Sequence, residues 1–371
     1  CSVYGSWRWS ANLSSPKNTT PVLMLPQSLQ TVFAAYPKSY FPRQWGTPDT
    51  AEGFSGASIY RLETDAGVFC LRGWPAGGLP KVRILGLHCL LKHVFAAGVA
   101  QVAVPVPALN GETLVTCNNQ NWQLEPWMPG QADFWKSPSD QRLKNAMACL
   151  ASFHRATRDY IDPSSARTWF NCHQQAVSPA IVERLGYLRD WQSEKLQHLD
   201  CRLPLVEYSE LRELGSELAF LFRRIADLVG KQLELLSRLR FPLQPCLRDV
   251  WHDHLLFTGD QVTGLIDASA CRYENIATDL SRLLGSLIAD DRNAWELALR
   301  EYETYRRLTD NERSLVQALD QSGVLLSGMA WLDRLILKNE QVAHFSKVMD
   351  RLVHLRDRLR TLDETIHGTL W

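Results

Sequence analysis

The chain has 371 residues, a length that predicts two or three domains, and 45% of them are hydrophobic, as is typical of globular proteins. Lysine plus arginine and aspartate plus glutamate both total 40, so the formal net charge is zero. This balance removes the electrostatic argument for a nucleic-acid partner. No apolar run approaches the roughly 18 residues that span a bilayer, so we expect neither a nucleic-acid nor a membrane partner.

The nine cysteines are scattered along the chain and form no CxxC motif. An odd number of cysteines without close spacing indicates neither a disulfide framework nor a cysteine zinc site. Reduced thiols that pack as small hydrophobic side chains fit this pattern and favour a cytoplasmic location. Residues 1–20 lack the charged and apolar regions of a signal peptide. The start at Cys1, rather than at methionine, favours residues that precede it.

Taken in chain order, residues 1–28 are rich in Ser, Asn, Pro and Thr and are expected to form a flexible arm. A short helix is expected over Leu29–Tyr36. Two β-prone runs, Ala57–Glu63 and Val68–Trp74, are separated by Thr64–Gly67. The Asp and Gly within that separation predict a β-hairpin.

The segment after this hairpin has apolar residues at helical spacing from Ile84 to Phe95, and Gly98 is expected to end the helix. Further short strands are expected over Val102–Pro107, Thr113–Cys117 and Trp122–Trp127. Residues 29–127 therefore read as an N-lobe made of an antiparallel sheet and a helix.

After residue 127 the sequence pattern changes from short β-prone runs to long segments with apolar residues at helical spacing. Ser137 and Pro138 predict the cap and first residue of a helix. Further long helices are expected over residues 177–197, 208–239, 292–307, 311–336 and 340–366. A hairpin at residues 246–268 interrupts them, so residues 128–371 read as a mostly helical C-lobe. The predicted class is α+β, with a small β-rich lobe and a larger helical one.

The densest group of polar functional residues lies in that hairpin segment. Asp249 and His254 precede its first apolar strand, and Asp267 follows its second. Because a tight hairpin returns the chain to its starting end, we expect these side chains to gather there. Two carboxylates and an imidazole suit a divalent cation and a general base. Charged groups beside apolar strands are costly unless they are paired or bound to metal.

This segment resembles the catalytic hairpin of the aminoglycoside phosphotransferase/choline kinase group, within the protein-kinase-like fold. That group carries H-x-D-x-x-x-x-N, apolar residues, a turn and I-D. Asp249 matches the catalytic aspartate, and Asp267 matches the metal-binding aspartate. Ala277–Leu280 is similar to the D-L segment that follows, where Asp279 is expected to hydrogen-bond to the catalytic loop. The order of lobes over about residues 50–290 is similar as well.

The resemblance implies phosphoryl transfer from ATP to a hydroxyl group of a small molecule. Asp249 would orient or activate the acceptor hydroxyl, and Asp267 would hold Mg²⁺ at the β- and γ-phosphates. The residues implied in nucleotide binding are Gly53 and Gly56 through their backbone, Arg72 through its charge, and Glu125 and Trp127 in the hinge that meets adenine.

Three positions depart from the family pattern. Leu247 stands in place of the His two residues before Asp249. His254 stands in place of the Asn five residues after it, and as a metal ligand it would favour Mn²⁺ over Mg²⁺. The helix after Arg72 offers no acid to pair with that cation, and His88 is near the position of the missing acid.

Two other functions are compatible with the same residues. A catalytically silent, kinase-like protein would bind a nucleotide or another ligand without turnover, as the replacements at Leu247, His254 and His88 permit. A metal-dependent hydrolase would use the His252 and His254 pair with the two aspartates, although no helical His pair supports it. No motif specifies the acceptor or an oligomeric state.

Overall fold

The computed structural model describes residues 20–21, 25–47, 57–163, 166–172, 174–342 and 344–368. Contacts within the chain divide it into two compact units. Unit 1 comprises Cys1–Cys172 and Val250–Arg272, and unit 2 comprises His173–Asp249 and Tyr273–Trp371. The predicted arm over 1–28 lies outside the described residues except at 20–21 and 25–28. The lobe bounds at 29–127 and 128–371 stay predictions.

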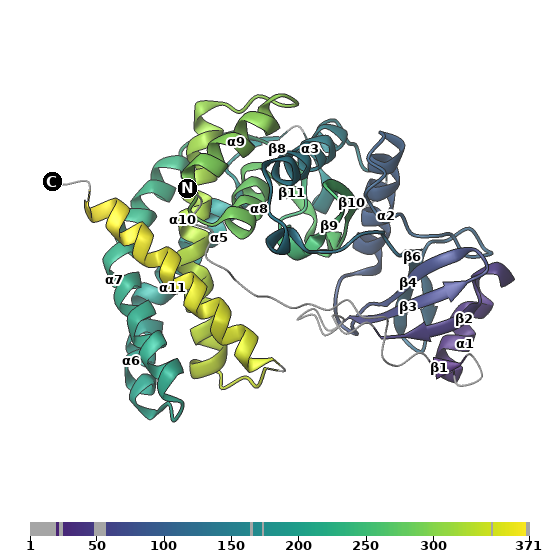
Figure 1. The fold of residues 1–371 in the computed structure, drawn as a ribbon, viewed down its shortest axis with the longest axis horizontal. Helices are drawn as coiled ribbons and strands as arrows, with labels where there is room; N and C mark the ends of the chain where they lie inside the picture. Colours follow the sequence, from purple (N-terminus) through teal and green to yellow (C-terminus); the bar gives the residue numbers. More distant parts are fainter. Residues whose placement is uncertain are drawn as a thin grey trace. The chain divides into compact units, whose positions relative to one another are not determined.

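Unit 1 contains an antiparallel six-stranded sheet in the order β1-β2-β3-β4-β6-β5 (Figure 1). Its strands are β1 Thr20–Pro21, β2 Pro42–Gly46, β3 Ser58–Thr64, β4 Gly67–Gly73, β5 Val115–Cys117 and β6 Gln120–Pro126. The predicted hairpin is confirmed, because β3 pairs with β4 from Thr64 opposite Gly67. Gly67 has a φ of 127°, which a side chain would strain. Strand β2 was not predicted.

The two faces of this sheet differ in chemistry because side chains alternate along each strand. Leu71 and Leu124 are paired across β4 and β6 and point into a buried apolar cluster. Arg72 is paired with Gln123, and Cys70 with Glu125, so these four side chains share the opposite face. One face therefore forms a hydrocarbon core, and the other carries polar and charged groups.

Each face is covered by a helix. Helix α1, Gln27–Ala34, buries Leu29, Val32 and Phe33 in the apolar cluster. Helix α2, Lys81–Ala96, directs His88 at Gln123 on the polar face. Both helices were predicted.

Two details in this part of unit 1 differ from the sequence-based expectation. Phe95, at the end of α2, is half exposed rather than on the buried face. The predicted strand over Val102–Pro107 is irregular, apart from a single bridge between Val102 and Leu265. The prolines in that segment lack the backbone N–H that a ladder requires.

The rest of unit 1 holds α3, Asp140–Thr157, α4, Arg167–Phe170, and the hairpin β9, Leu255–Thr258, with β10, Gln261–Leu265. The hairpin is the one predicted from the sequence. Helix α3 begins two residues later than expected, because Ser139 is its cap and accepts a hydrogen bond from the backbone N–H of Arg142.

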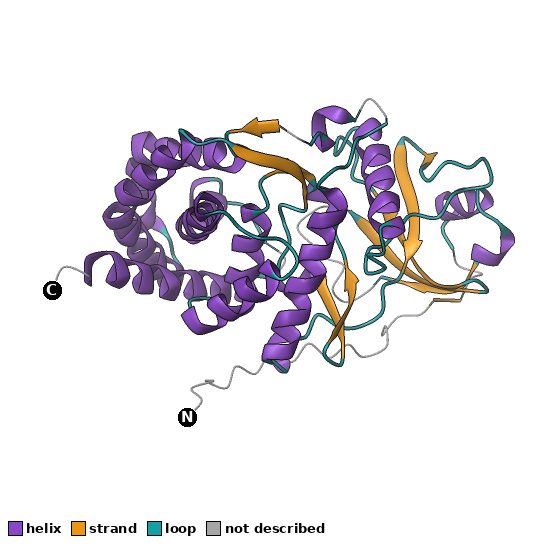
Figure 2. Cartoon of the chain, turned by 90° about the horizontal axis from the view of Figure 1, so that it is seen from above, coloured by secondary structure: helices purple, strands orange, loops and turns teal. Residues whose placement is uncertain are grey.

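Unit 2 is mostly helical (Figure 2). Its helices are α5 Pro179–Asp190, α6 Leu196–Arg202, α7 Ser209–Ser237, α8 Ala277–Ile288, α9 Arg292–Glu303, α10 Asp310–Leu332 and α11 Phe345–His367. A small sheet in the order β11-β8-β7 accompanies them, formed by β7 Gln174–Ala176, β8 Phe241–Cys246 and β11 Arg272–Glu274. Each of the long predicted helices has a counterpart, although the first is interrupted by a π-helical turn at Trp191–Lys195.

Shorter helical turns join these elements. They are Lys38–Tyr40, Phe134–Lys136, Leu203–Leu205, His252–His254 and Ala268–Ala270 in 3₁₀ geometry, and Asp333–Leu337 in π geometry.

Amphipathic spacing explains how the helices of unit 2 pack. Helix α7 buries Leu211, Leu214, Leu218, Phe222 and Ile225, which recur every three or four residues and so share one face. Helix α10 packs against α7, α8 and α11. None of the described helices is long and apolar enough to cross a membrane.

Candidate active site

The β9–β10 hairpin positions the first group of site residues, all in unit 1. Leu265 pairs with Leu255, so the residue just before β9 and the residues just after β10 emerge at the same end. His254 and Asp267 meet there, with Nε2 of His254 4.0 Å from Oδ2 of Asp267. The sequence-based expectation that the hairpin gathers Asp249, His254 and Asp267 is confirmed for the last two, and stays a prediction for Asp249.

Asp267 has the features of a cation ligand. Its backbone adopts the left-handed region, with φ 57° and ψ 62°, which aspartate tolerates better than most residues. Its Oδ1 atom is buried and receives no hydrogen bond within the described part of the chain. Burial opposes ionisation, but Arg72 and a hydrogen bond from Ser269 outweigh it, so the pKa of Asp267 is lowered. A buried, charged oxygen without a donor fits a divalent metal.

His254 is already engaged through one ring nitrogen. The indole N–H of Trp251 donates to Nε2 of His254 at 2.9 Å. Indole can only donate, so Nε2 carries no proton, and a neutral ring is protonated at Nδ1. A metal bound through His254 would have to displace this indole, and the assignment of His254 as a metal ligand stays a prediction.

His252, the other member of the HxH pair, makes a different contact. Its ring stacks on Trp135, with centroids 3.7 Å apart. The Trp251 ring also packs edge-on against His252, with centroids 4.9 Å apart, so His252 lies between two tryptophans. This arrangement favours the structural interpretation of His252 over a role in a zinc hydrolase.

Arg72 lies on β4 and has two acidic neighbours. Its Nε donates to Oε1 of Glu125 at 3.4 Å, and its Nη1 is 3.7 Å from Oδ1 of Asp267. Burial of the guanidinium opposes its charge, but the two carboxylates outweigh that effect, so the pKa of Arg72 is raised. As expected, α2 provides no acid for Arg72. The acid comes instead from β6, a pairing that was not predicted.

Glu125 is itself fixed by a buried hydrogen-bonded network. The amide of Gln123 donates to Oε2 of Glu125 at 2.6 Å. The carbonyl oxygen of the same amide accepts from Nε1 of Trp74 and contacts Nε2 of His88, both at 2.8 Å. Burial lowers the pKa of His88 to about 4, although the hydrogen bond to Gln123 acts in the opposite direction. His88, noted in the sequence as a departure, is therefore connected to Arg72 through two side chains.

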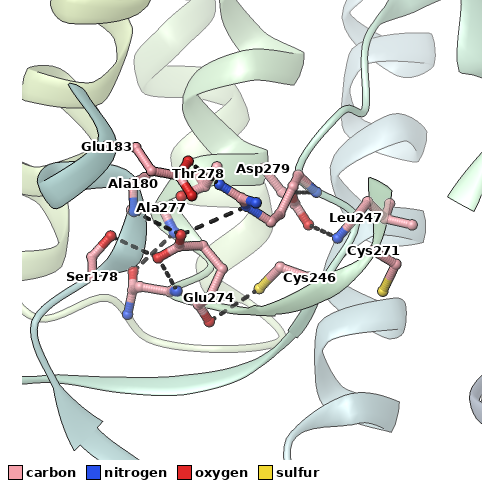
Figure 3. A network of polar contacts seen from close by, with 12 residues as sticks. Ser178, Ala180, Glu183, Cys246, Leu247, Cys271, Glu274, Ala277, Thr278 and Asp279 are labelled. Atoms are coloured by element: carbon pink, nitrogen blue, oxygen red, sulfur yellow. Dashed lines mark hydrogen bonds and ion pairs between the residues drawn. The ribbon is translucent and has the colours of Figure 1, made fainter. Parts of the chain in front are cut away.

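Asp249 belongs to unit 2, where helix α8 holds the loop that carries it. Asp279 is completely buried, and its carboxylate accepts a hydrogen bond from the backbone N–H of Leu247 at 2.8 Å (Figure 3). It accepts a second one from the backbone N–H of Arg248 at 2.6 Å. The predicted role of Asp279 is confirmed. One turn further along α8, Arg282 forms an ion pair with Oδ1 of Asp249. Residues three apart on a helix lie on one face, so α8 binds both the backbone and the side chain of this loop.

A second buried acid supports the same loop from β11. The Glu274 carboxylate accepts hydrogen bonds from Ser178 Oγ at 2.6 Å and from the backbone of Ala180 at 2.8 Å (Figure 3). Its Oε2 lies 3.7 Å from Nε of Arg248, whose own backbone has a φ of 64°. Burial raises the pKa of Glu274, although these hydrogen bonds oppose the shift. Nothing in the sequence marked Glu274, since its partners lie 94 and 96 positions away.

The remaining predicted nucleotide-binding residues differ in how far the structure describes them. Gly53 and Gly56 lie outside the described residues. Trp127 follows β6 directly, its backbone N–H donates to the carbonyl of Val68 at 3.1 Å, and the Arg61 guanidinium lies 5.8 Å from its ring centroid. The hinge assignment of Glu125 and Trp127 through their backbone stays a prediction.

Comparisons with known proteins identify the family of this chain. The sequence matches the Phosphotransferase enzyme family over residues 50–315. It is 24% identical over 288 residues to a homoserine kinase of Nitrobacter winogradskyi. The alignment covers 74% of this chain and 75% of that protein.

Solved structures show the same fold at low identity. A spectinomycin phosphotransferase in complex with ADP and spectinomycin has a TM-score of 0.67 at 10% identity, over 90% of this chain and 96% of that one. An amicoumacin kinase in complex with AMP-PNP and Ca²⁺ has a TM-score of 0.60 at 16% identity, over 89% and 92%. These likenesses concern the kinase-like two-lobe α+β fold. The chain belongs to the phosphotransferase enzyme family and is an ATP-dependent phosphotransferase that acts on a small molecule.

Proposed function

We propose that the protein transfers the γ-phosphoryl group of ATP to a hydroxyl group of a small molecule, with Asp267 as the metal ligand and Asp249 as the residue that orients the acceptor. The observation that carries this proposal is the buried Oδ1 of Asp267, which has no hydrogen-bond donor and faces Arg72 at 3.7 Å. A carboxylate oxygen left without a donor is costly unless a cation completes its environment.

Mg²⁺ is the metal that best fits this donor set, since hard carboxylate oxygens suit it and nucleotide phosphates supply its other ligands. When bound, it would neutralise the charge that develops on the phosphates. Asp267 would hold it, and the lowered pKa of Asp267 keeps the carboxylate ionised at neutral pH. His254 could bind the metal only if its Nε2 were released from the indole of Trp251. Because a preference for Mn²⁺ depended on an imidazole ligand, we propose no dependence on Mn²⁺.

Arg72 would provide the positive charge for the ATP phosphates. It is fixed from two sides and always protonated, so little reorganisation is needed when a nucleotide arrives. Gly53 and Gly56 are proposed to approach the phosphates through their backbone. The backbone at Glu125 and Trp127 is proposed to meet the adenine.

Asp249 would accept a hydrogen bond from the acceptor hydroxyl. Nearly half of its side chain is exposed, and it is accessible to a ligand within unit 2. Its Oδ1 is paired with Arg282, which fixes the orientation of the carboxylate. Phosphoryl transfer requires positioning more than proton abstraction, because the transition state is loose. An orienting role for Asp249 therefore suffices.

The test is thermal unfolding of the full chain with ATP and Mg²⁺, compared with ATP or metal alone. A nucleotide at 100 times its dissociation constant stabilises the folded state by about 2.7 kcal/mol. We expect this stabilisation to require both components and to be lost in Asp267→Asn. Asp249→Asn should keep the stabilisation and lose phosphoryl transfer in a screen of hydroxyl compounds that includes homoserine.

Two results would contradict the proposal. Full stabilisation of Asp267→Asn by metal and ATP would remove the metal assignment. Unchanged phosphoryl transfer by Asp249→Asn would remove the acceptor assignment.

A further inference from the structure

A continuous chain of buried polar side chains ends at Asp267. It starts with His88 on α2, passes through Gln123 and Glu125 on β6, and reaches Arg72 on β4. His88, Gln123 and Glu125 are each less than 10% exposed. Unpaired polar groups are costly inside a protein, so the hydrogen bonds that join these four side chains fix their relative orientation.

The direction of each hydrogen bond in this chain is fixed by chemistry. The Trp74 indole can only donate, so it must meet the oxygen of the Gln123 amide. The amide nitrogen therefore points at Glu125, which accepts. His88 must then be protonated at Nε2, and its Nδ1 accepts from the hydroxyl of Thr113 at 2.7 Å. A flipped amide would set oxygen against carboxylate and N–H against N–H, so Gln123 holds Glu125 in one orientation.

Glu125 and Asp267 compete for the same cation. Arg72 lies 3.4 Å from Glu125 and 3.7 Å from Asp267, so neither carboxylate holds it at the shorter distance of an unopposed pair, about 2.7–2.9 Å. If Glu125 lost its charge, Arg72 would be attracted by Asp267 alone. The guanidinium would then close on Oδ1, the oxygen that has no donor.

We propose that Glu125, oriented by Gln123 and His88, is a positioning residue for the metal site. It holds Arg72 back from Asp267 and thereby keeps Oδ1 available to a divalent cation. This inference rests on the proposed function, because it takes Asp267 as the metal ligand. It also gives His88 a role at the position where the helix lacks an acid.

The experiment is a titration of Mg²⁺ against the full chain at a fixed, saturating concentration of a non-hydrolysable ATP analogue, read as the shift in melting temperature. We expect Glu125→Gln to raise the half-saturating Mg²⁺ concentration by about tenfold, the change that the loss of one partly buried charge interaction corresponds to. Glu125→Asp keeps the charge and should stay within about threefold of the wild type.

The matched control is Glu63→Gln. Glu63 lies on β3 of the same sheet and pairs with Arg61 at 2.7 Å, and within the described part of the chain it forms no ion pair with Arg72. Its Mg²⁺ requirement should match that of the wild type. A loss of general stability in any variant would lower the melting temperature without ligand, and would leave the half-saturating Mg²⁺ concentration unchanged.

The outcomes separate this inference from the proposed function. A wild type that does not respond, or an Asp267→Asn variant that responds fully, removes the metal site and the inference with it. A wild-type Mg²⁺ requirement in Glu125→Gln, or an equal increase in Glu125→Asp and Glu125→Gln, overturns the inference alone. If Glu125→Gln fails to fold, Gln123→Met tests the same point, because it removes the donor that orients Glu125; an unchanged requirement there also overturns it.

Discussion

Protonation of His88 should destabilise the protein as the pH falls from 7 to 5. Its side chain is only 4% exposed and both ring nitrogens are in hydrogen bonds, one of them as an acceptor from Thr113. A second ring proton would therefore remove a hydrogen bond and bury a charge. The pKa of His88 is about 4 in the folded state, against 6.5 for an exposed histidine.

The sign and size of the effect follow from linkage. Below pH 6.5 the unfolded chain binds a proton that folded His88 does not, so the free energy of unfolding falls with pH. The loss begins near pH 6.5 and ends near pH 4, where the folded protein also binds the proton. Between pH 7 and pH 5 this single residue should account for about 2 kcal/mol.

The assay is urea unfolding of the wild type and His88→Gln at pH 7 and at pH 5, monitored by tryptophan fluorescence. All other titrating groups are common to both proteins, so the difference between their pH dependences isolates His88. The variant should be less stable at pH 7 and should lose about 2 kcal/mol less between the two pH values. Equal losses in both proteins, or an NMR titration of the His88 ring near pH 6.5, would refute the reasoning.

Three further predictions concern the loop, the helix that holds it and one close helix contact. Asp249→Asn should reduce kcat by at least about 100-fold, measured with an identified acceptor, while the ATP-dependent melting shift stays as in the wild type. Asp279→Ala removes two charge-assisted hydrogen bonds to buried backbone and should lower the free energy of unfolding by about 2–4 kcal/mol in urea; a loss below about 0.5 kcal/mol would contradict its assigned role. Gly86→Ala would place a methyl group against Ala166 and Phe170 and should cost about 1–3 kcal/mol despite the better helix propensity of alanine, as thermal unfolding would show.

The sequence predicted most of what is local. Asp and Gly between β-prone runs predicted the hairpins, and the spacing of apolar residues predicted the long helices. Strand β2, Pro42–Gly46, was missed because it begins with proline and has no alternating pattern. The apolar residues of Val102–Pro107 predict a strand, but the prolines of this segment cannot donate to a ladder and it is irregular.

The site divides in the same way. Asp267 and Asp279 could be selected from the sequence by a motif, because both lie a short distance along the chain from the β9–β10 hairpin. The side-chain role of Glu125 does not, since its partner Arg72 is 53 positions away and meets it only through the strand order of the sheet. Glu274 was missed for the same reason. Buried polar networks join residues that are distant in the chain, and local periodicity carries no information about them.

The alternation of side chains along β4 has a consequence for how this protein can vary. Leu71 enters the apolar cluster and Arg72 the charged network, although they are adjacent in the chain. A substitution at either position alters one layer and leaves the other in place. A single inserted or deleted residue would instead exchange the layers, because a shift of one residue turns every following side chain to the opposite face. The strand should therefore tolerate changes of residue type far better than any change of length.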